Sequence, residues 1–192
     1  MMRTVIVMVK EPRPGRVKTR LGREIGYTRS AWWFRHQSAA LLRRIQDPRW
    51  QVVLAVSPDR EGLQSRVWPH HLPRWPQGRG NLGDRMARMM SLAPNGPVCV
   101  IGADIPGINR KTLWTAFQGL AGHDAVFGPA MDGGYWLVGL RNGGHVPNGL
   151  FDGVRWSSET TLTDSIASLG QRRVALVDRL RDVDTVDDLA KI

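Results

Sequence analysis

The chain has 192 residues, of which 42% are hydrophobic and 23% charged, so it fits one globular domain over residues 1–192 and not a disordered chain. Lys and Arg total 27 against 17 Asp and Glu, and the resulting net charge of +10 predicts an anionic partner, whether nucleic acid, membrane or phosphate. A single cysteine excludes a disulfide framework, and there is neither a signal-peptide pattern nor an apolar run of about 18–20 residues, so we expect a soluble, cytoplasmic protein.

The first half of the chain opens on a strand and a basic loop. The β-branched run at residues 4–9 has the composition of a buried strand, and the segment 10–20 after it is rich in turn residues. Thr28 is expected to cap a helix that reaches about residue 46, because apolar residues recur there at helical spacing. A second strand is expected at 51–56, whereas residues 58–81, rich in Pro, Gly and Arg, have no assignable element.

The second half continues the alternation of helices and strands. Such alternation predicts an α/β fold, a three-layer α/β/α sandwich with a mostly parallel sheet. The short connection between residues 125–127 and 135–138 predicts one antiparallel strand. In chain order, the expected elements are a helix at 82–92, a strand at 98–102, a helix from Asn109 or Arg110 to about Leu120, strands at 125–127 and 135–138, a helix capped by Ser157 or Ser158 and reaching about Leu169, a strand at 174–177, and a short helix from Thr185.

The loop after the first strand concentrates positive charge. Lys10, Lys18 and Arg20 belong to a group of five cations within residues 10–20, opposed only by Glu11. Ligands of α/β folds bind at the carboxyl ends of the strands, and Gly15 lets the backbone approach a ligand closely. Cations that converge there can bind phosphate oxygens, although a solvated charged loop is the simpler interpretation. The glycine spacing of a P-loop is absent.

Acidic residues stand at three places in the second half of the chain. Asp104 ends the third strand, where its carboxylate can bind Mg²⁺ or Mn²⁺ or, alternatively, serve as a common turn residue. Asp132 lies in a glycine turn between two strands, which can face a ligand or be a simple hairpin. Asp182 and Asp184 precede the terminal helix, where Asp184 or Thr185 can be its N-cap.

Four motifs together resemble one known family. They are Lys-x-Pro-x-x-Gly-x-x-Lys-Thr-Arg-Leu from residue 10, Gly-x-Asp-x-Pro from 102, Gly-Pro-x-x-Asp-Gly-Gly-Tyr from 128 and Asp-Val-Asp-Thr from 182. In this order they resemble the bacterial DUF2064 family of nucleotide-diphospho-sugar transferase-like proteins, some members of which are called glycosyltransferases associated with arsenosugar biosynthesis. The chain is similar, more distantly, to 2-phospholactate guanylyltransferase and the molybdenum-cofactor nucleotidyltransferases. The resemblance implies the GT-A type fold that these proteins share.

The resemblance also implies roles for individual residues. Lys18 and Arg20 would bind nucleotide phosphates, and Asp104 would bind a divalent metal together with Asp184 or Asp182. The turn of Asp132, Gly133 and Gly134 would face the transferred group or the acceptor. The full nucleotide- and phosphate-binding set is Lys10, Gly15, Lys18, Arg20, Gln77, Gly78, Leu82, Gly83 and Arg85. A Gly-x-Gly-x-Arg loop, common in nucleotidyltransferases of this fold, is absent.

The leading functional hypothesis is a metal-dependent transferase that uses a nucleotide-activated donor and Mg²⁺ or Mn²⁺. A glycosyltransferase acting on a small-molecule acceptor is favoured, with Asp132 and Lys18 as catalytic residues. The alternative is a nucleotidyltransferase that couples a nucleoside triphosphate to a phosphorylated small molecule and releases pyrophosphate. A nucleic-acid-binding module is a remote alternative, because the sequence contains charge but no recognisable nucleic-acid motif.

Overall fold

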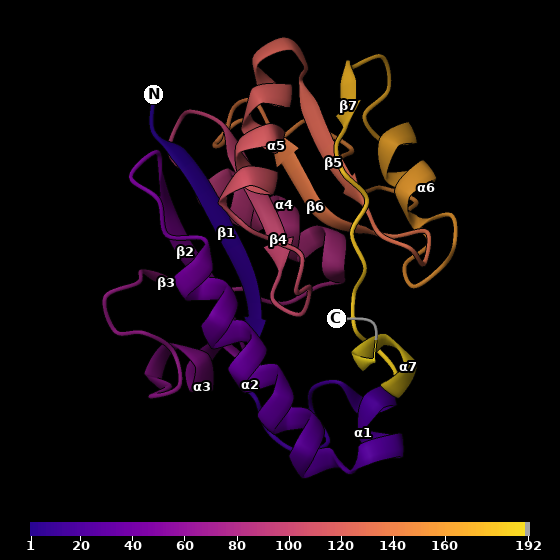
Figure 1. Cartoon of the computed structure of the whole chain (residues 1–192). Helices are drawn as coiled ribbons and strands as arrows, with labels where there is room; N and C mark the ends of the chain where they lie inside the picture. The colour runs from indigo at the N-terminus through magenta and orange to yellow at the C-terminus, as the bar shows by residue number, and fades with distance from the viewer. Residues whose placement is uncertain (191–192) are drawn as a thin grey trace.

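The computed structural model describes residues 1–190 and contains one seven-stranded sheet (Figure 1). The strands lie in the order β3-β2-β1-β4-β6-β5-β7. β6 runs antiparallel to both of its neighbours, and the other pairs of adjacent strands are parallel. The mostly parallel sheet with one antiparallel strand is therefore confirmed. The strands are β1 (Arg3–Lys10), β2 (Trp50–Ser57), β3 (Arg74–Pro76), β4 (Val98–Gly102), β5 (Ala125–Pro129), β6 (Tyr135–Leu140) and β7 (Val174–Leu176).

Helices cover both faces of the sheet, which confirms the three layers. Alternate residues of β1, such as Val5 and Val7, join one core cluster with Phe34 of α2 and Phe117 of α5. The intervening Ile6 joins a second cluster on the opposite face, with α4 and α6 packed there. This division follows from the two-residue side-chain period of a strand. The helices are α1 (Thr19–Ile25), α2 (Tyr27–Arg44), α3 (Asp59–Gln64), α4 (Leu82–Leu92), α5 (Arg110–Gly122), α6 (Thr161–Ala167) and α7 (Val186–Leu189).

Two of the predicted helix N-caps are confirmed and two are wrong. Asn109 and Thr185 cap α5 and α7 with their side chains, as expected. Thr28 does not cap α2, since the helix already begins at Tyr27 and Gly26 holds the N-cap position without a side chain. The expected cap at Ser157 or Ser158 is also wrong, because α6 begins only at Thr161.

The segment without assignable elements contains two short ones, α3 and β3. β3 has only three residues and pairs with β2 at the edge of the sheet, so it has little hydrophobic pattern to reveal it. The basic loop also ends in a helix that was not expected, α1. Its N-cap residue, Lys18, has a left-handed backbone conformation. Within residues 1–190 no helix combines the length and the apolar character that a bilayer span needs.

The carboxyl ends of β1 and β4 open toward one end of the molecule. In Figure 1 the arrowhead of β1 points to the end where α1 and α7 lie. These two helices come from opposite ends of the chain and contact one another. The topology therefore brings the basic loop after β1, the aspartate after β4 and the terminal aspartates to a single edge of the sheet.

Candidate active site

A cleft of about 450 Å³ lies at the carboxyl ends of β1 and β4, and we call it the basic cleft. The phosphate-binding residues expected from the sequence meet here with two aspartates. The predicted site residues that line it are Lys10, Lys18, Arg20, Gln77, Leu82, Arg85, Asp104 and Asp184. Arg16 also lines it. Five cations against two carboxylates leave the cleft with an excess of positive charge, which suits a phosphate-bearing ligand.

Lys18 joins the two halves of the chain at the centre of this cleft. Its Nζ lies 2.6 Å from Asp104 Oδ2 and donates a hydrogen bond of 2.7 Å to Asp184 Oδ1. The lysine side chain is only 6% exposed, while the two carboxylates are about one-third exposed. Burial alone would lower the pKa of Lys18, but the two carboxylates outweigh burial and raise it. Lys18 is therefore a charged clamp between the aspartates that follow β4 and precede α7.

The other cations of the basic cleft are engaged to different degrees. Arg20 donates one hydrogen bond of 3.2 Å to Asp184, and its side chain remains 70% exposed. Arg85 donates to Gln77 Oε1 at 3.3 Å, and Gln77 in turn is buried against the backbone of β1 and β2. Arg16 pairs with Glu61 of α3, at 3.5 Å. Arg20 consequently has the most freely available guanidinium for an incoming anion.

A second cleft of about 230 Å³ adjoins the first, and we call it the acidic cleft. The two clefts share Leu82, Gly102 and Asp104. Beyond this boundary the lining changes to carboxylates, hydroxyls and aromatic rings. The other polar and aromatic residues around it are Asp132, Tyr135, Trp156, Ser157, Ser158, Thr161 and Asp182. None of the lining residues within the described chain carries a positive charge.

The acidic character of this cleft is only partly compensated, because Lys18 pairs with Asp104 but is not among the lining residues. Asp182 is half-buried, and burial, followed by the nearby charges of Asp184 and Asp132, raises its pKa above the usual value. Asp132 Oδ1 accepts a hydrogen bond of 2.9 Å from the backbone N–H of Gly134. This bond holds the carboxyl group at the tip of the turn while its other oxygen stays available. Like charges gathered in one place favour a cation, a proton or a hydroxyl donor between them.

The aromatic wall of the acidic cleft depends on a glycine in α4. A side chain at Gly83 would meet Trp156 at 2.7 Å and Phe151 at 2.6 Å. The rings of Trp156 and Phe151 lie 5.9 Å apart and are tilted, which is a favourable aromatic pair. Gly83 thus lets Trp156 pack against the start of α4 and present its indole to the cleft. Gly83 was predicted to bind the nucleotide, but it does not line the basic cleft and instead makes room for Trp156.

Some predicted site residues lie outside both clefts. Gly133 adopts a positive φ of 87°, and an added Cβ would clash with the backbone of Glu159, so its role is to shape the turn. Gly78 has a φ of 76° and donates its N–H to Asp59, which anchors the segment before α4. Gly15 has open space around its Cβ position. Gly133 and Gly78 therefore position neighbouring residues, whereas Gly134 lines the acidic cleft.

Sequence reasoning gave little weight to Trp156, Ser157 and Ser158. The Trp-Ser-Ser segment reads as a helix start, yet it is a wall of the acidic cleft several residues before α6. Ser157 has a φ of 56°, an uncommon conformation for a residue other than glycine. The only local signal was an aromatic residue outside an apolar run, which does not by itself indicate a binding surface.

The donor set around the boundary between the clefts fits a hard divalent cation. Asp104 and Asp182 both line the acidic cleft with carboxylate oxygens, the atoms that Mg²⁺ and Mn²⁺ prefer. No group of three or more His, Cys, Asp or Glu side chains in residues 1–190 is arranged as a complete metal cage. Mg²⁺ commonly binds through one or two carboxylates and completes its shell with substrate phosphates and water, so two aspartates suffice.

Comparison with known proteins identifies the family. Residues 40–158 match the family model described as "Uncharacterized protein conserved in bacteria (DUF2064)". This chain belongs to the DUF2064 family. A crystal structure of a "putative nucleotide-diphospho-sugar transferase" from Desulfovibrio desulfuricans G20 is 30% identical, with a TM-score of 0.84 over 98% of this chain and 85% of that one. The family resemblance inferred from the four motifs is therefore confirmed.

More distant structures share the fold. Rv0371C of Mycobacterium tuberculosis H37Rv, solved in complex with manganese, is 15% identical, with a TM-score of 0.56, covering 100% of this chain and 97% of that one. A 4-diphosphocytidyl-2C-methyl-D-erythritol synthase from Anaerococcus prevotii DSM 20548 is 8% identical, with a TM-score of 0.62, covering 99% and 95%. No curated protein gives a significant match. The DUF2064 chain thus shares its fold with these proteins.

Proposed function

We propose that this DUF2064 protein is a metal-dependent glycosyltransferase that moves a sugar from a nucleotide-activated donor to a hydroxyl group of a small, uncharged acceptor. The observation that carries the proposal is the opposite charge of two adjoining clefts, which meet at Asp104. A glycosyl transfer needs a cationic site for a diphosphate and a separate site for a neutral nucleophile. The 30% identical protein described as a nucleotide-diphospho-sugar transferase supports the same class of donor.

The basic cleft is the proposed donor site. Arg20 and Lys10 are exposed cations there, and both can form charge-assisted hydrogen bonds with a diphosphate. Lys18 adds a buried positive charge at the boundary with the acidic cleft. As the bond between the sugar and the diphosphate breaks, negative charge develops on the departing oxygen. Fixed cations stabilise that charge without having to reorganise.

Asp104 and Asp182 are the proposed metal-binding residues, because both line the acidic cleft and Asp104 also lines the basic cleft, next to the proposed diphosphate site. A bound Mg²⁺ or Mn²⁺ would supply Lewis-acid stabilisation of the diphosphate. Asp184 was the first choice from the sequence, with Asp182 as the alternative. Its two oxygens accept hydrogen bonds from Lys18 and Arg20, so we assign it to holding these cations.

Asp132 is the proposed general base in the acidic cleft. The acceptor oxygen would attack the anomeric carbon of the donor and form the new glycosidic bond. The old bond to the diphosphate would break, and the nucleoside diphosphate would leave with the electron pair. The proton of the acceptor hydroxyl would pass to the free oxygen of Asp132, the one that Gly134 does not engage.

The acidic cleft argues against the nucleotidyltransferase alternative. That reaction needs a phosphorylated acceptor. Asp132 and Asp182 form no ion pair within residues 1–190 and would repel it, whereas Asp104 is paired with Lys18. A hydroxyl-bearing acceptor instead gains hydrogen bonds from the same carboxylates and from Ser158. It can also stack an apolar ring face on Trp156.

The test is a thermal-shift screen of nucleotide sugars and nucleoside triphosphates, with and without Mn²⁺, followed by product analysis. Ligand that binds the native state raises the melting temperature by mass action, so the screen identifies the donor class. We expect a nucleotide sugar to stabilise the protein in the presence of Mn²⁺ and its turnover to release nucleoside diphosphate. Pyrophosphate release from a triphosphate, without nucleoside diphosphate, would overturn the glycosyl assignment.

A further inference from the structure

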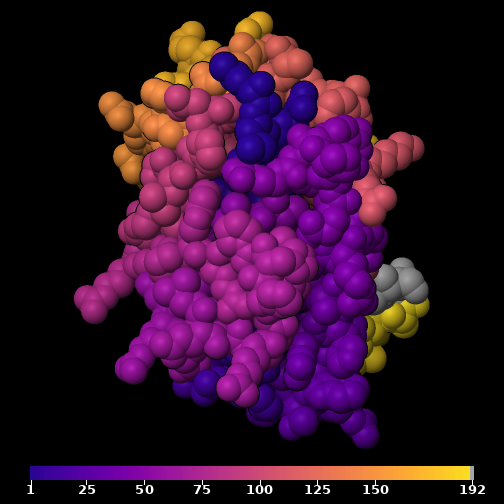
Figure 2. All heavy atoms as spheres, turned by 90° about the vertical axis from the view of Figure 1, so that its left-hand side faces the viewer, coloured from indigo at the N-terminus to yellow at the C-terminus, as the bar shows by residue number. Residues whose placement is uncertain are grey.

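A third cleft lies away from the proposed active site, between α2 and the segment 65–74. It measures about 700 Å³, the size of a small-molecule site. We call it the α2 cleft. Figure 2 shows the face of the molecule that carries the chain from α2 through α3 to β3, with long side chains projecting from it. The basic and acidic clefts share no lining residue with it.

The α2 cleft is lined by arginines and histidines. Arg35 and Arg43 reach it from α2, and Arg66, His70 and His71 reach it from the opposite segment. No Asp or Glu is among its lining residues in the described chain. The three arginines form no ion pair within residues 1–190. A cleft lined by one sign of charge focuses its potential and attracts anions.

The wall opposite α2 is a fixed structure. The guanidinium of Arg74 donates hydrogen bonds to backbone carbonyls of Leu63, Ser65 and Trp68 at 2.8–3.0 Å, so it holds the segment together and is itself satisfied. Ser65 also donates to Glu11, in the loop after β1, at 3.0 Å. Trp68 is only 3% exposed and packs in the core. The cleft therefore exists before any ligand binds, which lowers the entropic cost of binding.

The floor of the cleft adds an apolar surface to this charge. Ala39, Leu42 and Leu72 line it together with Trp68, whose indole N–H has no hydrogen-bond partner within residues 1–190. We propose that the α2 cleft binds a small organic anion with two or more phosphate or carboxylate groups and an apolar ring. Arginines bind planar or tetrahedral oxyanions through charge-assisted hydrogen bonds, while the apolar floor covers the ring. This binding is independent of the proposed transfer reaction.

ATP without divalent cations is the probe, because it combines a ring with three phosphates. Two-dimensional ¹H–¹⁵N NMR resolves the indole N–H signals, and Trp68→Phe identifies the signal from the α2 cleft. We expect this signal to shift saturably as ATP is added. In the double variant Arg43→Glu/Arg66→Glu, the apparent Kd from this signal should rise about tenfold or more, since two charged hydrogen-bond partners are lost.

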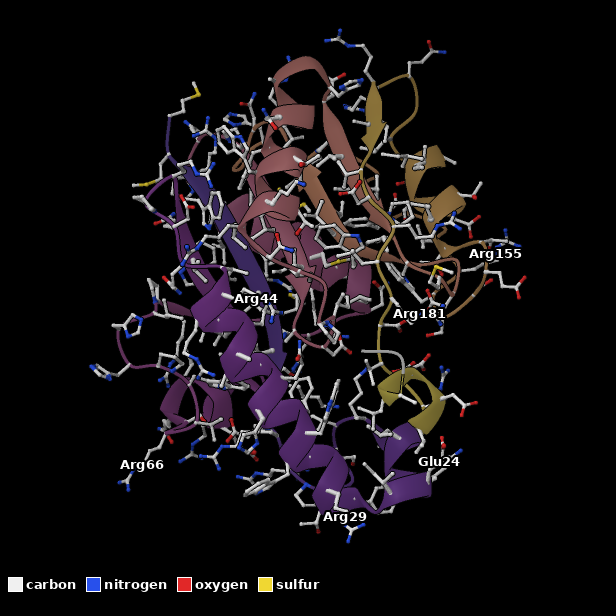
Figure 3. The ribbon with its side chains drawn as sticks, in the orientation of Figure 1. Glu24, Arg29, Arg44, Arg66, Arg155 and Arg181 are labelled. Carbon is white, nitrogen blue, oxygen red and sulfur yellow. The ribbon has the colours of Figure 1, made fainter. Side chains whose placement is uncertain are left out.

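Arg29→Glu is the control for a single such substitution, because Arg29 also lies on α2, undergoes the charge change that each arginine of the double variant undergoes, and lacks an ion pair in residues 1–190. Figure 3 shows Arg29 at the lower end of α2, apart from Arg66. The Kd measured in Arg29→Glu should stay near that of the wild-type protein. Equal weakening in Arg29→Glu and the double variant would show nonspecific attraction to a basic surface and would overturn the proposal.

Two more measurements separate this cleft from other binding events. Arg20→Ala, in the basic cleft, should leave the Trp68 response unchanged, whatever happens to donor binding. A Trp68 signal that responds only in proteins with an intact Arg20 would overturn the proposal without touching the proposed function. A single-stranded oligonucleotide that alone shifts the signal, with affinity falling steeply as salt rises, would also overturn it in favour of nucleic acid.

Discussion

The basic and acidic clefts share a boundary at Asp104 but differ in almost every chemical respect. Lys10, Lys18 and Arg20 line the first, whereas Asp132, Asp182 and aromatic rings line the second. Positive charge on one side of the boundary favours a phosphate group, and the carboxylates on the other side disfavour one. Under the proposed function, the two ligands would therefore be sorted by charge, with the diphosphate in the basic cleft and a neutral hydroxyl in the acidic cleft.

The contrast between the clefts reflects an uneven distribution of charge along the chain. Residues 1–90 contain 18 basic and 6 acidic residues, whereas residues 91–192 contain 9 basic and 11 acidic residues. The loop after β1 belongs to the first part, and all three aspartates of the acidic cleft belong to the second. Because the chain folds these parts against one another, a net charge of +10 is compatible with an acidic binding surface.

The largest effect is expected at the boundary itself. Asp104→Asn keeps the shape of the side chain but removes its charge, so it should abolish metal-dependent donor binding and lower turnover about 10²–10³-fold. Calorimetry with Mn²⁺ and a product assay measure the two effects. Asp178→Asn, at an exposed aspartate, is the control with the same charge change. Unchanged nucleotide affinity with Mn²⁺ in Asp104→Asn would refute the metal assignment.

Lys18→Met tests whether the charge of Lys18 offsets the negative charge of Asp104 and Asp184. Loss of the ammonium leaves Asp104 and Asp184 without their shared partner, so Mn²⁺ affinity of the free protein should rise about tenfold while donor affinity falls about tenfold. Lys10→Met is the matched control, because Lys10 lines the same cleft without an ion pair in the described chain. It should weaken donor binding only. Weaker Mn²⁺ binding in Lys18→Met would contradict the proposed balance.

Arg20→Ala sharpens the assignment of the basic cleft to the donor. The loss of one charge-assisted hydrogen bond should weaken donor binding about tenfold and leave the KM for the acceptor unchanged. Arg23→Ala is the control on the same short helix, and Arg23 does not line the cleft. Equal losses in both variants would mean that the general charge of α1, and not a specific contact, attracts the donor.

The smallest effect is expected on the acidic side. Trp156→Leu removes the aromatic face and should raise the acceptor KM about 3–10-fold, while donor affinity stays the same. Steady-state kinetics at saturating donor measures the change. Trp32→Leu, at a tryptophan on α2 that is 64% exposed, should leave both parameters unaltered. A donor effect in Trp156→Leu with an unchanged acceptor KM would reverse the roles of the two clefts.

Part of this architecture could be predicted because its signals are local. The strands β1, β2 and β4 are continuous apolar runs, which parallel strands buried on both faces require. Asp104 follows one of these runs directly. Its position at the carboxyl edge of the sheet, where α/β folds bind ligands, could therefore be predicted without knowing the rest of the fold. β3 and α1 were missed because three and seven residues carry too little periodicity.

The fold class, the family and the position of Asp104 at the carboxyl edge of the sheet could be predicted from the sequence, since they depend on patterns within short segments. Which charges meet could not be predicted in this way, because it depends on contacts between distant parts of the folded chain. Lys18 and Asp184 are 166 residues apart, and their ion pair exists because α1 and α7 come together beneath β1 and β4. Trp156 likewise became a cleft wall through contact with Gly83, a neighbour that no local pattern specifies.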